Sequence, residues 1–228
     1  MTLTLRETIP CVLTIAGSDS GGGAGIQSDL KTFTALGVFG ACAITAITAQ
    51  NTKGVYEVFP IPARVVEKQI ETVLSDLSIN VVKTGMLYTK EIVQVVVEAI
   101  KKYGLKAVVD TVFRAGSEDL LILEEGREAL VRELIPNAFI VTLNRYEAED
   151  VAEMEIKNRE DMIEAATKIA ELGAEAIIVK GGHLQGTEVV DILYYNESYK
   201  MFTKPRIPLD IHGGGCTFSS AIAAYLAK

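Results

Sequence analysis

The sequence predicts an α/β fold, with a central, mostly parallel sheet flanked by helices on both faces and a small hairpin or edge flap. Short apolar runs rich in β-branched residues alternate with segments of helical periodicity along the whole chain. This alternation is typical of parallel strands joined by crossover helices. The 228 residues, about half of them apolar, suit one core. We therefore expect residues 1–228 to form a single domain.

The expected strands are short and mostly apolar, as strands buried on both faces are. In chain order they span residues 11–16, 79–82, 107–110, 138–142 and 176–180. The helices between them are predicted from their ends. Thr89 is the expected N-cap of a helix that ends at Gly104, and Asn158 with Asp161 begins another that ends at Gly173.

Two segments interrupt this rhythm. Residues 43–49 are followed closely by residues 54–58, and residues 189–195 by residues 198–203. In each case two β-prone runs are separated by only a few residues, which favours antiparallel pairing. We expect these segments to form hairpins or an edge flap.

Composition disfavours several classes of function. The formal net charge is −8, whereas a nucleic-acid surface needs clustered lysine and arginine. No stretch approaches the ~20 apolar residues that cross a bilayer, and no signal peptide is evident. The three cysteines, Cys11, Cys42 and Cys216, form no CxxC pattern or even framework. We expect a cytoplasmic protein without nucleic-acid or membrane partners, with Cys11 and Cys42 in the core.

Two glycine-rich segments are the strongest candidates for ligand binding. The first spans residues 16–25 and leads into a helix that contains Asp29 and Lys31. Its glycines permit tight turns and the close approach of backbone N–H groups to a ligand. It matches neither the P-loop nor the dinucleotide-binding fingerprint. On its own it indicates either a ligand loop or a glycine-rich connection without a function.

The second segment places Gly213, Gly214 and Gly215 at the expected start of the last helix, directly before Cys216. Free N–H groups and the helix dipole there would stabilise the charge that develops on a phosphoryl group in transfer. A thiol at a helix start is expected to have a lowered pKa and could act as the base for a substrate hydroxyl. The alternative is that Cys216 is a small buried apolar residue.

Polar residues also follow the expected strands, where ligands bind in open α/β sheets. Asp110 is either a turn former or a metal-side carboxylate. Lys180 is either a solvated lysine or a phosphate contact. Thr142 lies at the next strand end, and Asn144 and Glu147 are either an N-cap with its N3 carboxylate or groups that orient water around Mg²⁺.

His183 and His212 are the only histidines in the chain. Neither forms a Ser/His/Asp pattern or a metal-ligand spacing with its neighbours. We expect both to be loop residues or supports for other functional groups.

Several independent motifs follow one another along the chain. They are LTIAGSD (13–19), GIQSDLK (25–31), AQNT (49–52), KTGML (83–87), DTV (110–112), KGGH (180–183) and the glycine-rich helix start at Cys216. With these motifs in this order, the chain resembles the bacterial and archaeal hydroxymethylpyrimidine kinase/phosphomethylpyrimidine kinase. The resemblance spans nearly the whole chain.

This resemblance implies a ribokinase-like fold and two ATP-dependent phosphorylations, with Mg²⁺ as the metal. The first would fall on the hydroxymethyl group of 4-amino-5-hydroxymethyl-2-methylpyrimidine, and the second would convert the monophosphate to the diphosphate in thiamine biosynthesis. Carried over by motif, the residues that would bind the pyrimidine are Gly17, Asp29, Gln50, Met86 and Val112. Gln50 would hydrogen-bond the aminopyrimidine edge, because a carboxamide donates and accepts at once.

The resemblance also assigns the transfer machinery. Cys216 would stand where sugar kinases of the superfamily place an aspartate base, beside the amides of residues 213–215. The residues expected on the ATP side are Lys180, Asp110 and Thr142, and those expected near the metal are Asn144, Glu147 and Asp110. Many relatives are dimers, so we expect a homodimer.

The chain departs from the family pattern at a few positions. The family usually has threonine where Gly214 stands, and prolines where Thr111 and Leu143 stand. The chain stops at Lys228, and we expect it to lack the family's usual C-terminal helices. Two alternatives stay open: a pyridoxal or pyridoxine kinase of the same superfamily, and a non-catalytic pyrimidine-binding module.

Overall fold

The computed structural model describes residues 9–115, 119–182, 184, 186–209 and 211–228. Its strands are β1 (Cys11–Asp19), β2 (Phe39–Asn51), β3 (Gly54–Pro60), β4 (Val81–Thr84), β5 (Lys106–Asp110), β6 (Ile140–Asn144), β7 (Ala176–Lys180), β8 (Glu188–Tyr195) and β9 (Ser198–Pro205). Its helices are α1 (Gly25–Ala35), α2 (Ala63–Asp76), α3 (Lys90–Tyr103), α4 (Glu124–Ala129), α5 (Arg145–Ala152), α6 (Arg159–Ala170) and α7 (Gly214–Ala227). A π-helical turn (Leu130–Leu134) and a 3₁₀ turn (Ile135–Asn137) follow α4.

The described strands form one nine-stranded sheet in the order β3-β2-β1-β4-β5-β6-β7-β8-β9. β2, β1, β4, β5, β6 and β7 are mutually parallel. β3, β8 and β9 each run antiparallel to the preceding strand. The predicted fold class is therefore confirmed, and both interrupted segments are hairpins. β2 is more than part of a flap, because it also pairs with β1 over most of its length.

The strand boundaries differ from the sequence prediction mainly where polar residues end an apolar run. β7 has the predicted limits, but β4 and β6 begin and end two residues later than expected. Thr84 is paired with Ile15 of β1, and Asn144 with Lys180 of β7. Backbone pairing with the neighbouring strand thus extends β4 and β6 into polar sequence that the apolar pattern does not include.

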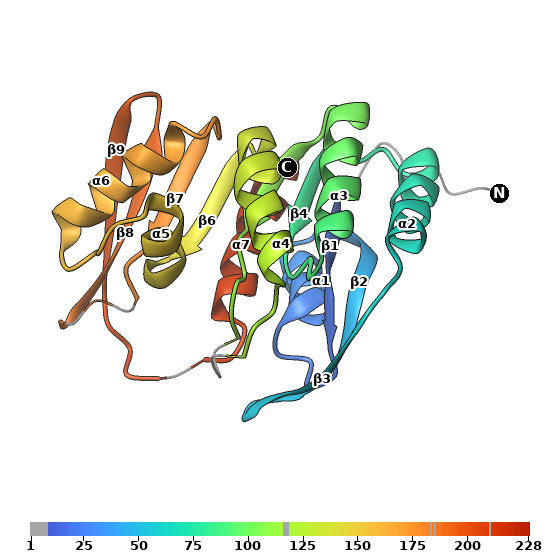
Figure 1. Cartoon of the computed structure of the whole chain (residues 1–228), viewed down its shortest axis with the longest axis horizontal. Helices are drawn as coiled ribbons and strands as arrows, with labels where there is room; N and C mark the ends of the chain where they lie inside the picture. Colours follow the sequence, from blue (N-terminus) through green and yellow to red (C-terminus); the bar gives the residue numbers. More distant parts are fainter. Residues whose placement is uncertain (1–8, 116–118, 183, 185, 210) are drawn as a thin grey trace.

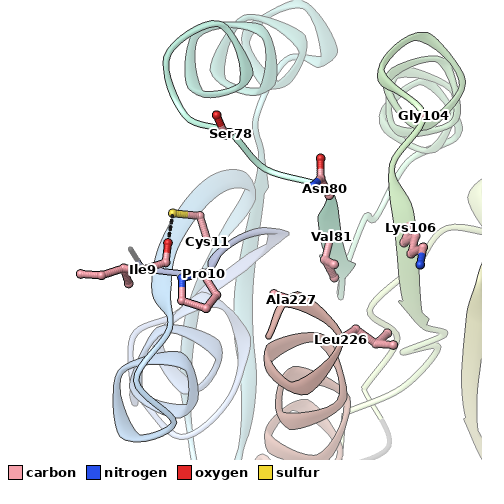
Figure 2. A pocket seen from close by; sticks show the side chains of 10 residues that line it. All are labelled: Ile9, Pro10, Cys11, Ser78, Asn80, Val81, Gly104, Lys106, Leu226 and Ala227. Atoms are coloured by element: carbon pink, nitrogen blue, oxygen red, sulfur yellow. Dashed lines mark hydrogen bonds between the residues drawn. The ribbon is translucent and has the colours of Figure 1, made fainter. Parts of the chain in front are cut away.

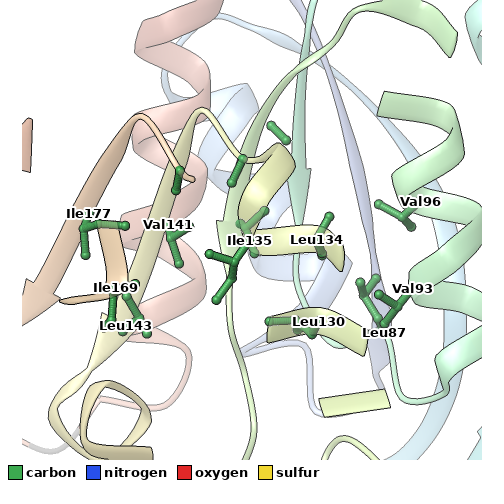
Figure 3. Packing of buried hydrophobic residues seen from close by; sticks show 14 of the residues in the cluster. Leu87, Val93, Val96, Leu130, Leu134, Ile135, Val141, Leu143, Ile169 and Ile177 are labelled. Carbon is green, nitrogen blue, oxygen red and sulfur yellow. The ribbon is translucent and has the colours of Figure 1, made fainter. Parts of the chain in front are cut away.

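Helices cover both faces of the sheet (Figure 1). α1 and α7 pack against each other and against β1 on one face. α2, α3, α4, α5 and α6 lie on the other face, where α6 contacts β7 and β8. The main core fills this second interface, and Figure 3 shows Val93 and Val96 of α3 facing Leu130 and Leu134. None of the described helices has the length and apolarity that a bilayer-spanning segment needs.

Cys11 and Cys42 are half-buried and free, so neither is the fully buried core residue that the sequence predicts, although Cys11 packs against the main core. Cys11 is the first residue of β1. Cys42 lies on the part of β2 that precedes its pairing with β3, where β2 is the outer strand of the sheet.

The predicted N-cap of α6 gives a direct test of the fold. The Asn158 carboxamide accepts a hydrogen bond from the Asp161 amide (2.9 Å), and the Asp161 carboxylate accepts one from the Asn158 amide (3.2 Å). Asn158→Ala is expected to lower the free energy of unfolding by about 1 kcal/mol. The measurement is urea unfolding, with Asn158→Ser as the matched control because serine can cap the same amide. Equal losses for alanine and serine would contradict this role of the cap.

Candidate active site

A small pocket opens at the carboxyl ends of β1, β2, β4 and β5. It is lined by Gly17, Ser18, Asp19, Ala24, Gly25, Thr48, Gln50, Gly85, Met86, Val112, Leu121 and Cys216. The pocket thus brings four of the five expected pyrimidine-binding residues next to the expected base. Their contacts with a ligand stay predictions. Asp29, the fifth, lies beneath the pocket instead.

The apolar wall of the pocket is formed by Met86 and Leu121, which make a small separate cluster with Ala46, and Val112 packs against this cluster. Gly17 makes room for this wall, because a Cβ at that position would lie 2.9 Å from the Met86 sulfur. Val112 has a φ of 30°, a conformation that β-branched residues rarely adopt. The fold therefore holds Val112 in a strained conformation at the pocket wall.

The polar side of the pocket is ordered by Thr48. Its hydroxyl lies 3.1 Å from Gln50 Oε1 and 3.0 Å from the carbonyl oxygen of Ser18. The backbone of Gln50 is fixed as well, since its amide donates to the Ser20 hydroxyl (2.9 Å). The carboxamide of Gln50 is therefore oriented before any ligand arrives.

The first glycine-rich segment is folded around the carboxylate of Asp19. This carboxylate accepts hydrogen bonds from the amides of Gly21 (2.7 Å), Gly23 (3.0 Å) and Ala24 (2.9 Å). Burial raises the pKa of Asp19, but the hydrogen bonds from His212 and these amides outweigh it and lower the pKa below its ordinary value. These three amides donate to Asp19, so they are not free to bind a ligand.

His212 connects the two glycine-rich segments, as a supporting residue would. Its Nε2 lies 3.0 Å from Asp19 Oδ2. The backbones of the segments also touch, because a Cβ at Gly213 would overlap the carbonyl oxygen of Gly23. His183, which the sequence also predicts to be a loop or supporting residue, lies outside the described residues.

The amide-rich helix start predicted from the triple glycine is present. Gly213 is the N-cap of α7 in the left-handed conformation, and the first hydrogen bond inside the helix runs from the Thr217 amide to the Gly213 carbonyl (2.9 Å). The N–H groups of the three residues between them have no carbonyl of the same helix to donate to. Gly214 borders open space, and a Cβ at Gly215 would lie 3.4 Å from Lys180 Nζ. Amides, helix dipole and a lysine thus converge on one point.

Cys216 does not have the lowered pKa that its place at a helix start predicts. Burial raises the pKa of the thiol to about 11, and the lowering effect of the nearby Lys83 does not offset it. The carboxylates of Asp110 and Asp29 raise this pKa further. In the unliganded protein the thiol is therefore protonated at neutral pH.

Asp110 is the centre of a buried polar cluster at the end of β5. Its carboxylate accepts hydrogen bonds from the hydroxyls of Thr142 (2.9 Å) and Ser219 (3.1 Å), and Lys180 Nζ lies 3.4 Å away. Burial raises the pKa of Asp110, but Lys180 and Lys83 hold it below its ordinary value. Thr142 is fully buried and its hydroxyl donates to Asp110, so the expected contact with ATP is wrong for that side chain.

Asn144 and Glu147 form the N-terminal capping box of α5. The Glu147 carboxylate accepts from the Asn144 amide (2.8 Å), and the Asn144 carboxamide accepts from the Glu147 amide (3.0 Å). Burial raises the pKa of Glu147, and the nearby Asp110 adds to this. Among the described residues no group of three or more His, Cys, Asp or Glu side chains gathers to hold a metal directly. The N-cap interpretation of Asn144 and Glu147 is therefore correct, and their role in orienting water around Mg²⁺ stays a prediction.

Asp29 belongs to a second buried cluster. Lys83 Nζ lies 3.0 Å and 3.1 Å from its two carboxylate oxygens, and the hydroxyls of Thr14 and Ser220 donate to them at 2.6 Å each. Because Asp29 is fully buried and its oxygens have these partners, the expected contact with the pyrimidine is wrong. Sequence reasoning misses Lys83, although a lysine inside the apolar strand 81–84 signals a buried counter-charge.

A wider recess lies at the opposite edge of the sheet (Figure 2). It is bordered by the beginnings of β1, β4 and β5 and by the end of α7, through Cys11, Val81, Lys106 and Leu226 among others. None of the site residues described above lines it. The candidate active site is therefore the smaller pocket at the carboxyl ends of the strands.

A small pocket beside an amide-rich helix start is what a small-molecule kinase needs, and the sheet is of the ribokinase-like type. Comparison with known proteins agrees with this class and specifies it. Residues 19–228 match the family described as phosphomethylpyrimidine kinase. The chain belongs to this family.

Relatives and solved structures support the assignment. The chain is 47% identical over 218 residues to a hydroxymethylpyrimidine/phosphomethylpyrimidine kinase of Rhizobium meliloti, covering 95% of this chain and 82% of that protein. It is similar to the crystal structure of phosphomethylpyrimidine kinase from Clostridium difficile 630, with a TM-score of 0.85, 46% identity, and coverage of 96% and 91%. The pyridoxal kinase of Staphylococcus aureus in complex with AMP-PCP and pyridoxal has a TM-score of 0.88 at 38% identity, with coverage of 96% and 81%.

The contact between the glycine-rich segments can be tested by substitution. Gly213→Ala introduces a Cβ that overlaps the Gly23 carbonyl oxygen, in a residue whose φ is 80°. We expect the α7 start to be displaced and the rate of ADP formation to fall by a factor on the order of 10², as when a transition-state donor is lost. Gly104→Ala is the matched control, because Gly104 also has a positive φ (61°) but borders open space. Equal rates for the two variants would contradict the importance of this contact.

Proposed function

We propose that the protein uses ATP to phosphorylate 4-amino-5-hydroxymethyl-2-methylpyrimidine and then its monophosphate, as in thiamine biosynthesis. One observation carries the proposal: Gln50, Met86 and Val112 line the same pocket as Cys216, at the amide-rich start of α7. A flat ring held by the first three residues directs its hydroxymethyl group to the place where a phosphoryl group is stabilised. The names of the relatives, including hydroxymethylpyrimidine/phosphomethylpyrimidine kinases, support the same reaction.

The pocket suits a neutral aminopyrimidine. Gln50 can donate and accept hydrogen bonds along the polar ring edge, and Thr48 fixes its orientation. Met86 offers an adaptable apolar contact for the ring face, with Val112 beside it. The recognition of the ring therefore needs no charged side chain.

The transfer step needs a proton acceptor and charge stabilisation. Cys216, as the thiolate, takes the proton of the substrate hydroxyl while the hydroxyl oxygen bonds to the γ-phosphorus and the bond to the ADP oxygen breaks. The amides of Gly214, Gly215 and Cys216 stabilise the equatorial phosphoryl oxygens. Positioning and charge stabilisation supply most of the rate.

The ATP side is assigned to the Lys180 end of the site. Lys180 would neutralise phosphate charge, since its Nζ lies close to Gly215 and next to Asp110. Asp110, Asn144 and Glu147 would hold the water shell of Mg²⁺. When bound, Mg²⁺ supplies charge neutralisation on the transferring phosphates.

A vitamin B6 kinase is the second candidate function. The observation that favours it is the high structural similarity to the pyridoxal kinase of Staphylococcus aureus. Pyridoxal is also a flat ring with a hydroxymethyl group, so the same pocket could direct it to the same amides. A non-catalytic pyrimidine-binding module is the third candidate, and it predicts pyrimidine binding that does not depend on Mg-ATP.

We also propose a homodimer and a cytoplasmic location. The β2–β3 hairpin exposes large apolar side chains, Ile47, Tyr56 and Phe59, of a kind that subunit contacts bury. The three cysteines are free, which fits a reducing compartment.

Purified protein tests the reaction directly. With Mg-ATP and the hydroxymethylpyrimidine we expect ADP and both the mono- and diphosphate products, measured by chromatography. We expect kcat/KM for the pyrimidine to exceed that for pyridoxal, because specificity is a difference in transition-state binding. The reverse order would favour the vitamin B6 kinase. Calorimetric binding of the pyrimidine without any ADP would instead favour the binding module.

Cys216 gives the second test. Cys216→Ala is expected to lower kcat by a factor on the order of 10² or more with little change in pyrimidine affinity, as for loss of a general base. Because the thiol pKa is raised to about 11 and the thiolate is the active form, kcat of the unaltered enzyme should rise with pH from neutral towards that value. Cys42→Ala, a half-buried cysteine outside the pocket, is the control. Unchanged turnover in Cys216→Ala would assign the thiol a packing role.

A further inference from the structure

A buried ion pair lies directly below the pocket floor. Lys83 of β4 and Asp29 of α1 both have fully buried side chains. Gly85 lines the pocket, and a Cβ at Gly85 would lie 3.1 Å from Lys83 Nζ. Only the backbone of a glycine therefore separates the ammonium group from the substrate space.

This pair also joins four elements of the fold. The Asp29 carboxylate accepts hydrogen bonds from Thr14 of β1 and from Ser220 of α7, at 2.6 Å each. Ser220 is four residues after Cys216 and so lies on the same side of the helix. Asp29 and Lys83 thus hold α7 through the face that carries the thiol.

Stability alone does not account for such a pair. Burial of two charges carries a large desolvation cost, which their mutual attraction must offset. Proteins in which a buried ion pair is replaced by apolar residues of similar volume are commonly as stable or more stable. A buried pair next to a reactive group has another use, because the low dielectric strengthens its effect on that group.

The charged groups around the Cys216 thiol come from four elements. Lys83 of β4 and Lys180 of β7 favour the thiolate, whereas Asp29 of α1 and Asp110 of β5 oppose it. Lys83 has the largest effect of the charged residues on the thiol, and Asp29 keeps Lys83 charged by raising its pKa against the effect of burial.

We propose that Lys83 is a positioning residue for phosphoryl transfer: paired with Asp29, it holds the N-terminal half of α7 and places a permanent positive charge below Cys216. This proposal rests on the proposed function. The ammonium stabilises the negative charge on sulfur before the transfer and so raises the fraction of Cys216 present as thiolate, the form that takes the proton of the substrate alcohol and becomes a neutral thiol. Lys83 itself touches neither substrate nor phosphate in this scheme.

The test compares two variants that are expected to change the alkylation rate of the Cys216 thiol in opposite directions. Asp29→Asn removes the opposing charge and keeps a side chain that can bond Thr14 and Ser220, while Asp110 still favours the charged form of Lys83. Asp29→Asn/Lys83→Met removes the whole pair and leaves no unpaired buried charge, so it should fold. Below the thiol pKa the rate of alkylation follows the thiolate fraction, and peptide-resolved mass spectrometry reads iodoacetamide labelling of Cys216 alone.

We expect the alkylation rate of Cys216 at pH 8 to rise in Asp29→Asn and to fall about tenfold in the double variant, one pKa unit being a factor of ten. In the double variant kcat should fall by roughly the same factor, with KM for the pyrimidine changed about twofold at most. Lys102→Met, which removes a surface lysine 3.1 Å from Glu71, should change none of these values.

The role of Lys83 would be overturned if the alkylation rate changed in the same direction in both variants or changed in neither. A general loosening of the fold cannot produce changes of opposite sign. Thermal unfolding of each variant identifies such loosening. Unaltered protein that forms no ADP with the pyrimidine would overturn the proposed function and the transfer step with it. A failure confined to Lys83 leaves wild-type turnover intact, so the two failures are distinguishable.

Discussion

Three buried carboxylates hold the start of α7 against the ends of the strands. His212 lies 3.0 Å from Asp19, Ser219 donates to Asp110 at 3.1 Å, and Ser220 donates to Asp29 at 2.6 Å, with the three acids on β1, β5 and α1 respectively. Each hydrogen bond to a charged acceptor is stronger than a neutral one, and buried networks of this kind specify a unique geometry when every member has a partner. The position of the amide-rich turn, and hence of any phosphoryl group bound there, depends on these contacts.

The same carboxylates determine the electrostatics of the site. Three acids next to the amide-rich turn would repel an anion if their charge were not balanced. Lys83 is paired with Asp29, Lys180 with Asp110, and the carboxylate of Asp19 accepts three loop amides. Each acid thus has a partner of its own, while Gly214 at the start of α7 borders open space. The balanced acids therefore do not cancel the partial positive charge of the helix start.

The sequence predicts the fold and the location of the site better than the role of each residue. Alternating strands and helices define the parallel sheet, and the rule that ligands bind at the carboxyl ends of strands brings both glycine-rich segments to one edge. Asp29 and Thr142 are not placed correctly, because their partners Ser220 and Asp110 are 191 and 32 residues away along the chain. The pKa of Cys216 is wrong for a related reason. The helix start is local and visible, whereas burial and the acids that raise the pKa come from other elements.

A buried thiol at this position differs from a further carboxylate. Cys216 already lies near Asp29 and Asp110, and in the proposed reaction another fixed negative charge there would oppose the approach of a triphosphate. The resting thiol is neutral and adds no such charge. To act as a base it must first lose its proton, and the thiolate, which Lys83 favours, becomes neutral again when it takes the proton of the substrate alcohol. The high pKa that burial imposes on Cys216 thus keeps the resting site less negative, and it limits the fraction of the protein that holds the base ready.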